Sequence, residues 1–377
     1  MNEKRICFLA HANSIHRIRV VNHFAERGWD CHWITYTDPI SEVHPDVKIY
    51  RVKRMKVSDI KLIPRVIYYS RQMRTLLKDR EPLIIHATEI YTWGLYGSEF
   101  KRLRPENPLV LTAVGFHHIR TSKGIRKRYE TKAFQRANII VTYNQEMTDV
   151  ISRTYRVPQS KFLTFPNKGV DLDVFKIGYD ADVKALRNEL EIPMDTKVIL
   201  SPRNMVEVYG TEHIVRAIPD VVKKHPDVVF VFLKGYGETE YLKAMRILSG
   251  KLGIVKNVRF VEDLVPYDRM PIYYNMSHVT VMLPRSDHSP TSISEAMACG
   301  SILVATDIPG NREWISDSKN GFLASADGKG LSGIINGTLD DPKMKSRFTK
   351  KNLSVVKEKG DWFRNMKKLE DAVAKLL

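Results

Sequence analysis

Two carboxylates and a row of hydroxyls surround the expected start of a short helix in residues 284–300, which read PRSDHSPTSISEAMACG. Asp287 lies just before this helix, and Glu295 lies about one and a half turns inside it. Both side chains can therefore border the same pocket. The alternative is an ordinary capped helix that carries two surface acids.

The start of this helix has the features of an anion-binding site. Ser289 is a good N-cap, and Pro290 fits the first helical position because the N–H that it lacks has no partner there. The backbone N–H groups of Thr291 and Ser292 then point outward without helical partners. Unpaired amides at the positive end of a helix dipole bind phosphate groups. The sequence therefore predicts a phosphate site beside the two carboxylates.

Three other loops follow expected strands and carry residues that could hold a ligand. Arg203, in PRNMVEVYG, could clamp a phosphate bidentately, although most loop arginines are only solvated. Gly235 and Gly237 would let a ligand approach the backbone, although a tight turn explains them nearly as well. Residues 307–314, DIPGNREW, end at another helix start, and a structural turn is the default interpretation of that loop.

Short apolar runs recur along the chain with room for a helix between them, as a doubly wound parallel sheet requires. Five fall in each half: 5–10, 32–35, 83–85, 109–113 and 138–142, then 197–201, 228–234, 258–261, 279–283 and 301–306. Two similar α/β domains, joined within 165–193, are therefore expected. Ligands of such sheets bind outside the carboxyl ends of the strands, where the loops described above lie. Helices are expected over 213–224, kinked or divided at Pro219, and over the charged tail 344–377.

The composition predicts a folded, water-soluble protein, since 43% of the 377 residues are apolar and the longest apolar runs have only strand length. A membrane-spanning helix needs roughly 20 consecutive apolar residues, so none is expected. The N-terminal MNEKRICFLAHA is interpreted as a first buried strand rather than a signal peptide. The three cysteines are widely spaced without a metal-binding pattern, which favours a reducing cytoplasm.

The whole chain has a formal net charge of +17, and its positive charge is concentrated in the first half. Residues 1–170 hold 30 Lys and Arg against 15 Asp and Glu, whereas residues 171–377 hold 30 against 28. Residues 51–80 predict either a basic amphipathic helix on an anionic surface or a solvated helix packed on its own domain. A second basic cluster at 123–128 shifts the prediction toward an anionic surface or substrate.

The second half resembles the retaining nucleotide-sugar glycosyltransferases of the GT-B fold, specifically glycosyltransferase family 4, also called group 1. Its landmarks occur in the family's order: GVDLDVF, PRN, KGYG, NVRFVEDL, the two acids followed by AMACG, and NREWISDSKNGFL. The first half resembles the family's acceptor domain only loosely, through HANSIH, IIHATEIYTWG and LTAVGFH. The resemblance implies an α/β fold of two Rossmann-like domains that face each other across a cleft. The expected parts are an acceptor-binding domain (1–170), a linker (171–195), a donor-binding domain (196–345) and a helical segment that packs back on the N-terminal domain (346–377).

The resemblance also implies roles for residues at the expected donor site. Arg203 would bind the donor diphosphate and stabilise it as it leaves, and the amides of Thr291 and Ser292 would bind the distal phosphate. Asp287 would contact hydroxyls of the transferred sugar, and Glu295 would contact the donor ribose. An arginine and a helix start can meet the charge of a departing diphosphate without a metal ion. The expected donor-binding residues are Arg203, Tyr209, Lys234, Gly235, Gly237, Val261, Asp287, Pro290, Thr291, Ser292 and Glu295, with no metal and no cofactor.

Three features depart from the family pattern. The first acid of the family is usually Glu, and Asp287 is one methylene shorter. The usual Lys after the Arg falls at Tyr209 or Val208, so another base, Lys234, is expected to compensate. The acceptor-side loop, where many members carry a His shortly after a Thr, reads TAVGFHH over 112–118, so His117 or His118 could be a displaced substitute, although a lone His in a loop is more often structural. The tight Gly-Gly that many members have after the first strand is also absent. The expected acceptor-binding residues are His16, His86, Gly115, His117 and His118, and His117 is also a catalytic candidate.

Together these features predict a cytoplasmic, metal-independent, retaining glycosyltransferase that is peripheral on the inner face of a membrane. It would transfer a hexosyl or N-acetylhexosaminyl group from a UDP- or GDP-sugar to a lipid-linked acceptor or a cell-surface glycan precursor. A soluble polyanionic glycan or a small phosphorylated acceptor fits the charge nearly as well. Two alternatives remain: a sugar-nucleotide epimerase of the same fold, and a basic nucleic-acid-binding protein, for which no recognition motif is found and which is therefore not expected.

Overall fold

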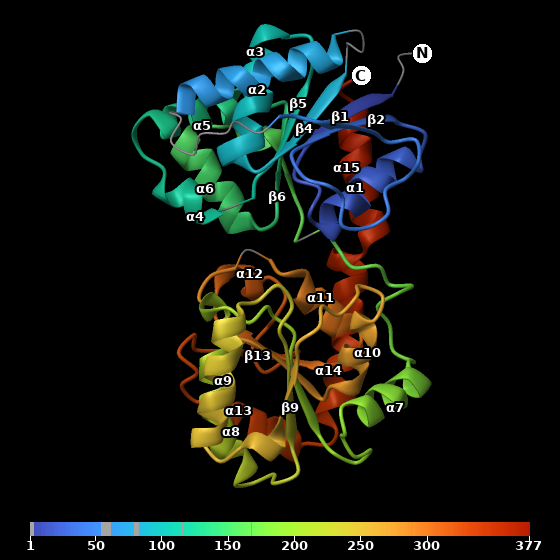
Figure 1. The fold of residues 1–377 in the computed structure, drawn as a ribbon, viewed down its shortest axis with the longest axis vertical. Coiled ribbons are helices and arrows are strands. Elements are labelled where there is room, and N and C mark those ends of the chain that lie inside the picture. Colours follow the sequence, from blue (N-terminus) through green and yellow to red (C-terminus); the bar gives the residue numbers. More distant parts are fainter. Residues whose placement is uncertain (1–3, 54–61, 79–82, 115, 167, 288) are drawn as a thin grey trace. The chain divides into compact units, whose positions relative to one another are not determined.

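Two units, each built on its own parallel β-sheet, make up the chain in the computed structural model, which describes residues 4–53, 62–78, 83–114, 116–166, 168–287 and 289–377 (Figure 1). The N-terminal domain consists of residues 1–165 together with Arg364–Leu377. The C-terminal domain consists of Pro166–Phe363. Each domain has its own hydrophobic core.

The N-terminal domain contains a seven-stranded parallel sheet in the order β3-β2-β1-β4-β5-β6-β7. The strands are β1 (Arg5–Leu9), β2 (Asp30–Thr35), β3 (Lys48–Arg51), β4 (Ile84–Thr88), β5 (Leu109–Thr112), β6 (Ile139–Thr142) and β7 (Phe162–Thr164). Every residue of β4 and β5 is buried, as expected for parallel strands that are covered on both faces. The strand order reverses between β1 and β4, which makes the loops after these strands the usual place for a ligand.

Among the described residues, seven α-helices, one π-helical turn and a 3-10 helix (Gln159–Lys161) cover this sheet or lead into it (Figure 1). The α-helices and the π-helical turn are α1 (Ile15–Ala25), α2 (Leu62–Leu77), the π-helical turn (Ile90–Gly94), α3 (Leu95–Leu103), α4 (Phe116–Thr121), α5 (Gly124–Arg136), α6 (Gln145–Tyr155) and α15 (Trp362–Ala374). α3 packs against both α2 and α5. The end of α15 is anchored in this domain, because Glu370 accepts a hydrogen bond from Trp29 Nε1 at 3.0 Å and lies 3.3 Å from Arg27 Nε.

The C-terminal domain contains a six-stranded parallel sheet in the order β10-β9-β8-β11-β12-β13. The strands are β8 (Val198–Ser201), β9 (Val229–Leu233), β10 (Val258–Val261), β11 (Val279–Met282), β12 (Ile302–Thr306) and β13 (Phe322–Ala324). The helices are α7 (Asp180–Glu189), α8 (Thr211–Val222), α9 (Thr239–Lys251), α10 (Met270–Met276), α11 (Thr291–Ala298), α12 (Pro309–Arg312), α13 (Leu331–Asp340) and α14 (Met344–Val355). The strand order reverses between β8 and β11, so the loops after these strands mark the expected ligand site.

The doubly wound α/β fold expected from the sequence is confirmed in both domains, and each of the ten expected strands is present. The strands that the pattern missed are β3, β7 and β13, which lie at the edges of the two sheets. All three are short and partly exposed. An edge strand buries fewer side chains than a central one, so it does not need the continuous apolar run by which the others were recognised.

The basic stretch 51–80 forms α2 over Leu62–Leu77, while residues 54–61 and 79–80 lie outside the described residues. The apolar face of α2 is packed in the core of its own domain through Val66, Tyr69 and Met73. Its arginines at 71 and 74 are exposed. None of the helices in the described part of the chain is long and apolar enough to cross a membrane.

Two further segments differ in detail from the expectation. Pro219 lies inside α8, which continues to Val222 rather than being divided. Residues 171–195 contain α7, which packs against α10 within the C-terminal domain. The charged tail is helical in α14 and α15, with a π-helical turn at Val356–Gly360 between them.

Candidate functional site

The loops that follow β8 and β11 are held side by side in the C-terminal domain. The N–H of Arg285 donates to the carbonyl of Val208 at 2.9 Å. Gly210 has φ +68°, and a Cβ at this position would lie 2.3 Å from the carbonyl oxygen of Leu283. Glycine alone satisfies both the left-handed backbone and the close approach. This contact brings the side chains of the two loops within reach of one another.

Arg203, in the loop after β8, has partners on both loops and on α11. Its Nη2 donates to Asp287 Oδ2 at 2.7 Å, and its Nη1 donates to Ser292 Oγ at 3.3 Å. The guanidinium carbon lies 4.2 Å from the centre of the Tyr209 ring, a cation–π arrangement. Burial tends to lower the pKa of Arg203, but Asp287, Tyr209 and Tyr274 raise it overall, so the side chain stays charged.

One donor of this guanidinium is unused. The Nε–H of Arg203 is shielded from solvent, and it has no hydrogen-bond partner among the residues that the structure describes. Buried donors in folded proteins are almost always paired. The arrangement of Arg203 therefore leaves a place for an acceptor atom that the described protein atoms do not supply.

The start of α11 lies where the sequence predicted it, but its cap differs. The helix begins at Thr291 with Pro290 at the N-cap, and no side chain caps it. Ser289 Oγ instead accepts a hydrogen bond from Trp314 Nε1 at 3.0 Å. The prediction that Ser289 caps the helix is wrong, because an indole 25 residues further along the chain binds its hydroxyl. The amides of Thr291 and Ser292 are the first two of the helix and have no partner within it.

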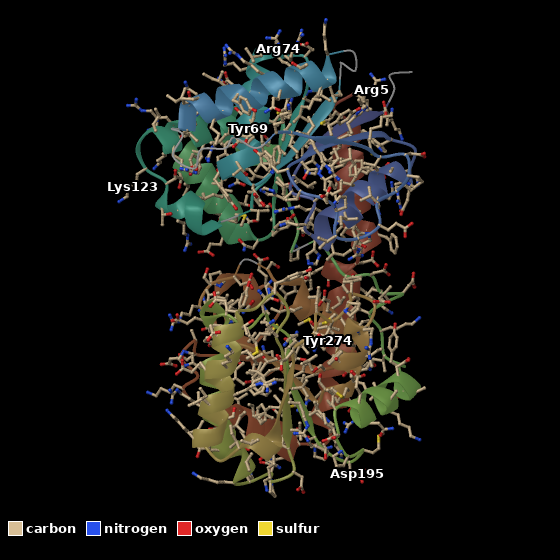
Figure 2. The ribbon with its side chains drawn as sticks, in the orientation of Figure 1. Arg5, Tyr69, Arg74, Lys123, Asp195 and Tyr274 are labelled. Carbon is tan, nitrogen blue, oxygen red and sulfur yellow. The ribbon has the colours of Figure 1, made fainter. Side chains whose placement is uncertain are left out.

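Glu295 lies about one turn inside α11 and is only 8% exposed. Its Oε2 accepts a hydrogen bond from the hydroxyl of Tyr274, on α10, at 2.9 Å. Tyr274 is fully buried inside the C-terminal domain (Figure 2). Burial raises the pKa of Tyr274, the charge of Glu295 raises it further and the charge of Arg203 lowers it. Tyr274 therefore holds the Glu295 carboxylate as a hydrogen-bond donor.

The glycines of the KGYG landmark are explained by packing within the protein. A Cβ at Gly235, where φ is +55°, would lie 2.2 Å from Asn204 Oδ1, and a Cβ at Gly237 would lie 2.6 Å from the backbone of Met205. The same loops are hydrogen-bonded, since the N–H of Met205 donates to the carbonyl of Lys234 at 3.0 Å. The loop that carries Arg203 therefore approaches the backbone at both glycines, and their contact with the donor stays a prediction.

The remaining expected donor residues lie beside these loops. The N–H of Lys234 donates to the carbonyl of Val261 at 2.8 Å, which joins the ends of β9 and β10. Within the described part of the chain, the Lys234 ammonium forms no ion pair and no hydrogen bond. Tyr209 is occupied in stacking on Arg203. No group of three His, Cys, Asp or Glu side chains that could hold a metal ion occurs among the described residues.

The histidines expected on the acceptor side are dispersed. His86 lies in β4 and is 4% exposed, with Nε2 2.8 Å from Thr112 Oγ1 and its ring against Phe8, so it belongs to the domain core. His16 lies in the first turn of α1 and is partly buried. Gly115 lies outside the described residues. The backbone of His117 and His118 belongs to α4, but their side chains are not described. These three expectations stay predictions.

A buried ion pair that the sequence did not reveal follows β4. Arg17, on α1, pairs with Glu89, which is 6% exposed, and His11 Nε2 lies 3.7 Å from the same carboxylate. Glu89 has φ +70°, a strained conformation for a residue with a side chain. Such strain is concentrated at functional sites, and this pair lies at the switch point of the N-terminal sheet.

Models of two glycosyltransferase families match the two halves of the chain. Residues 182–354 match the family described as glycosyl transferases group 1, and residues 5–144 match the family described as glycosyl transferase 4-like. The chain belongs to the group 1, family 4-like glycosyltransferases. The predicted resemblance is confirmed, and it extends to the N-terminal domain, for which the sequence motifs were loose.

Curated relatives of this family member are matched over part of their length. The D-inositol 3-phosphate glycosyltransferase of Corynebacterium jeikeium is 30% identical over 190 residues, which are 49% of this chain and 44% of that protein. The GDP-mannose-dependent alpha-(1-6)-phosphatidylinositol monomannoside mannosyltransferase of Mycolicibacterium smegmatis is 25% identical over 212 residues, 52% of this chain and 54% of that protein. The matches thus span about half the length of these relatives.

Solved structures match the fold over the whole chain. Anabaena Alr3699/HepE in complex with UDP has a TM-score of 0.79 at 16% identity, over 98% of this chain and 100% of that chain. Sucrose-phosphate synthase from Thermosynechococcus elongatus has a TM-score of 0.82 at 18% identity, over 99% of each chain. At these identities the comparison establishes the GT-B fold alone.

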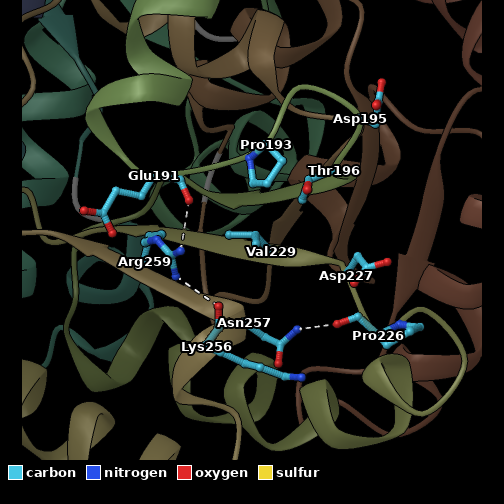
Figure 3. A pocket seen from close by; sticks show the side chains of 10 residues that line it. All are labelled: Glu191, Pro193, Asp195, Thr196, Pro226, Asp227, Val229, Lys256, Asn257 and Arg259. Carbon is cyan, nitrogen blue, oxygen red and sulfur yellow. Dashed lines mark hydrogen bonds between the residues drawn. The ribbon is translucent and has the colours of Figure 1, made fainter.

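The NVRF landmark of the family is structural in this glycosyltransferase fold. It borders a pocket of about 490 Å³ at the amino-terminal ends of β8, β9 and β10, the edge of the sheet opposite to Arg203. Figure 3 shows Asn257 directed at the carbonyl of Pro226, with a distance of 2.9 Å. The Arg259 guanidinium donates to four carbonyls, those of Leu190, Glu191, Lys256 and Val258. The Arg259 side chain at this pocket is therefore committed to backbone carbonyls of its own domain.

The residues that sequence reasoning missed act through contacts distant in sequence. Tyr274 binds Glu295 from 21 residues away, and Trp314 binds Ser289 from 25 residues away. Trp314 belongs to the NREW landmark, which could have identified it as a site residue, whereas Tyr274 lies in no landmark.

Proposed function

We propose that the chain is a metal-independent, retaining glycosyltransferase that uses a nucleoside-diphosphate sugar, in UDP or GDP form, as its donor. The observation that carries this proposal is the buried Nε–H of Arg203, which has no partner in the described part of the chain and lies beside the start of α11. The bound UDP that the Anabaena structure's description records supports a nucleoside diphosphate as the missing acceptor. Family membership alone supports the retaining outcome.

Arg203 and the α11 start would act on the diphosphate. As the bond between the sugar and the diphosphate breaks, negative charge builds on the leaving oxygen. A fixed guanidinium and the amides of Thr291 and Ser292 can stabilise that charge without having to reorganise. Lys234, whose ammonium forms no ion pair with a described residue, would supply the positive charge that the family's usual Lys provides.

The two acids would bind neutral hydroxyls rather than phosphate. Asp287 would contact the transferred sugar, and its bond to Arg203 Nη2 at 2.7 Å would orient its carboxylate next to the diphosphate. Glu295 would contact the donor ribose, held in place by Tyr274 at 2.9 Å. This division leaves the phosphate charge to the arginine and the helix start.

The acceptor would be anionic or held at an anionic membrane, and would receive a hexosyl or N-acetylhexosaminyl group. The basic N-terminal half supports this, because residues 1–170 hold twice as many basic as acidic residues. The names of the relatives include an inositol 3-phosphate and a phosphatidylinositol monomannoside glycosyltransferase, which are consistent with such acceptors. A lipid-linked sugar or a glycan precursor on the inner face of a membrane fits both observations.

Product analysis of the purified protein with UDP- and GDP-sugars tests the reaction. We expect slow hydrolysis of one donor without acceptor, release of nucleoside diphosphate in the presence of EDTA, and a product with the anomeric configuration of the donor. Conversion of the donor into its epimer at the sugar, with no sugar released, would establish the epimerase alternative instead.

Sedimentation with vesicles tests the membrane part. Binding to phosphatidylcholine vesicles that contain an anionic lipid should fall as salt is raised, and neutralising the exposed arginines of α2 should weaken it. Equal sedimentation with neutral and anionic vesicles at low salt would remove this part of the proposal.

A further inference from the structure

A basic pocket opens at the carboxyl edge of the N-terminal sheet. It has a volume of about 480 Å³, within the range of small-ligand sites. Its walls come from the π-helical turn after β4, from the end of α4 and the start of α5 after β5, and from the first turn of α2. The groups in these walls that can bind an anion belong to Arg65, Tyr91, Thr92, Ser122, Lys123 and Arg126.

The charges in this pocket are not balanced by the protein. None of the residues that line it is acidic. Within the described chain, Arg65, Lys123 and Arg126 take part in no ion pair. Burial raises the pKa of Tyr96, whereas the charges of Arg65 and Arg126 act in the opposite direction.

Two polar atoms of the pocket are shielded from solvent and unsatisfied. Arg65 Nε and Ser122 Oγ have no hydrogen-bond partner among the described residues. A guanidinium donor and a hydroxyl are both groups that bind phosphate oxygens. Their unpaired state is an observation independent of the surrounding charge.

Arg65 and Arg126 lie at positions where their positive charges do not stabilise the helices that carry them. Arg65 lies in the first turn of α2, Arg126 lies in the first turn of α5, and neither helix has an acid in its first turn. The amino-terminal end of a helix carries partial positive charge, so cations there are unfavourable unless an anion is bound. Both helix starts would instead add their amides to an anion site.

We propose that this pocket binds the phosphate ester group of the acceptor. The acceptor role rests on the proposed glycosyltransferase function, whereas the binding of a phosphate ester does not. The pocket lies on the loops after β4 and β5, beside the switch point at which doubly wound sheets hold their ligands. The phosphate ester belongs either to a soluble sugar phosphate or to a lipid headgroup.

Calorimetric titration with glucose 6-phosphate tests the site directly, with glucose as the neutral control. Arg126→Gln and Arg65→Gln should each weaken binding by roughly 10- to 100-fold, the loss expected for one charge-assisted contact. Arg128→Gln on α5 and Arg71→Gln on α2 remove the same charge from exposed positions on the same helices and should leave the affinity unchanged. Arg203→Ala should also leave it unchanged, which separates this site from the donor site.

The source of the phosphate is distinguished with vesicles of phosphatidylcholine with or without phosphatidic acid. If Arg126→Gln weakens binding only to the vesicles that contain phosphatidic acid, the phosphate belongs to a lipid headgroup. If it weakens binding only to glucose 6-phosphate, the phosphate belongs to a soluble ester. Equal binding of both probes by Arg126→Gln and Arg128→Gln would overturn the proposal. Release of nucleoside diphosphate from the donor without acceptor should be the same in Arg126→Gln and Arg128→Gln as in the unmodified chain. An absence of this release in the unmodified chain would contradict the proposed function and not the phosphate site.

Discussion

Arg203 Nη2 and Asp287 Oδ2 are 2.7 Å apart, which joins the loops after β8 and β11 through a partly buried ion pair. The shorter carboxylate of Asp287, compared with the family's usual Glu, is long enough to reach the guanidinium. The acid that we propose contacts the sugar and the arginine that we propose binds the diphosphate are thus directly coupled. Changes at one of them should therefore be measurable at the other.

Asp287→Asn should separate donor binding from turnover. The amide keeps the size of the side chain but removes the charge that attracts Arg203, so the guanidinium becomes more available to a diphosphate. We expect nucleoside diphosphate affinity to be equal to or higher than that of the unmodified chain, with turnover lowered roughly 100-fold or more. Asp307→Asn, in the loop after β12, is the control and should alter neither quantity. A fall in affinity with unchanged turnover would contradict the assignment.

Gly210→Ala should damage the site through the backbone. The new Cβ would lie 2.3 Å from the carbonyl oxygen of Leu283, so the loops after β8 and β11 must separate. Gly253→Ala is a matched control, since Gly253 has φ +69° but a Cβ there meets nothing within 4 Å. The left-handed backbone alone costs about 1–2 kcal/mol in either variant. Gly210→Ala should in addition lose nucleoside diphosphate affinity in a titration, and equal affinities in the two variants would be inconsistent with this role.

Tyr274→Phe should weaken both the fold and the donor site. The change removes the hydrogen bond to Glu295 and leaves a buried carboxylate with one partner fewer, which costs about 1–3 kcal/mol of unfolding free energy. Urea unfolding measures this loss. Nucleoside affinity should fall as well, because the carboxylate is no longer oriented toward the ribose. Tyr273→Phe, on the same helix but outside the site, is the control for the loss of a tyrosine hydroxyl, and an equal loss of affinity there would refute the role of Tyr274.

The stability of the C-terminal domain should fall at acidic pH through His278. Burial, followed by the charges of Lys345, Lys197 and Arg187, lowers the pKa of His278 to about 3 from its ordinary 6.5. Between these values the unfolded chain binds a proton that the folded chain does not, so unfolding becomes more favourable as pH falls from 6.5 toward 3.

His278→Gln should reduce this pH dependence. One titrating group contributes a slope of about 1.4 kcal/mol per pH unit between its two pKa values. Urea unfolding at several pH values below neutrality should therefore show a shallower decline in the variant than in the unmodified chain. Parallel curves for the two proteins would show that His278 is not the group responsible.

The features of the fold and of the site that could be predicted from the sequence are those that depend on the burial of a strand or on neighbouring residues in the chain. Central strands such as β4 and β9 are continuous apolar runs, whereas the edge strand β3 is largely exposed and carries no such signal. Arg203 was identified because it follows an expected strand, and Glu295 because it lies near the start of an expected helix. The partners of these residues could not be identified from the sequence, because contacts such as that of Tyr274 with Glu295 depend on how distant elements pack. The prediction of an N-cap at Ser289 was wrong for the same reason, since the Ser289 hydroxyl accepts a hydrogen bond from the distant Trp314.

Calorimetric titration of UDP and GDP into the unmodified chain and into Arg203→Ala tests the central claim most directly. We expect one of the two nucleotides to bind the unmodified chain, and Arg203→Ala to weaken that binding by about 10- to 100-fold, while thermal unfolding shows that the fold is retained. Arg216→Ala, on the exposed face of α8, removes the same charge and should bind as the unmodified chain does. Equal nucleotide affinity in Arg203→Ala and Arg216→Ala would contradict the account.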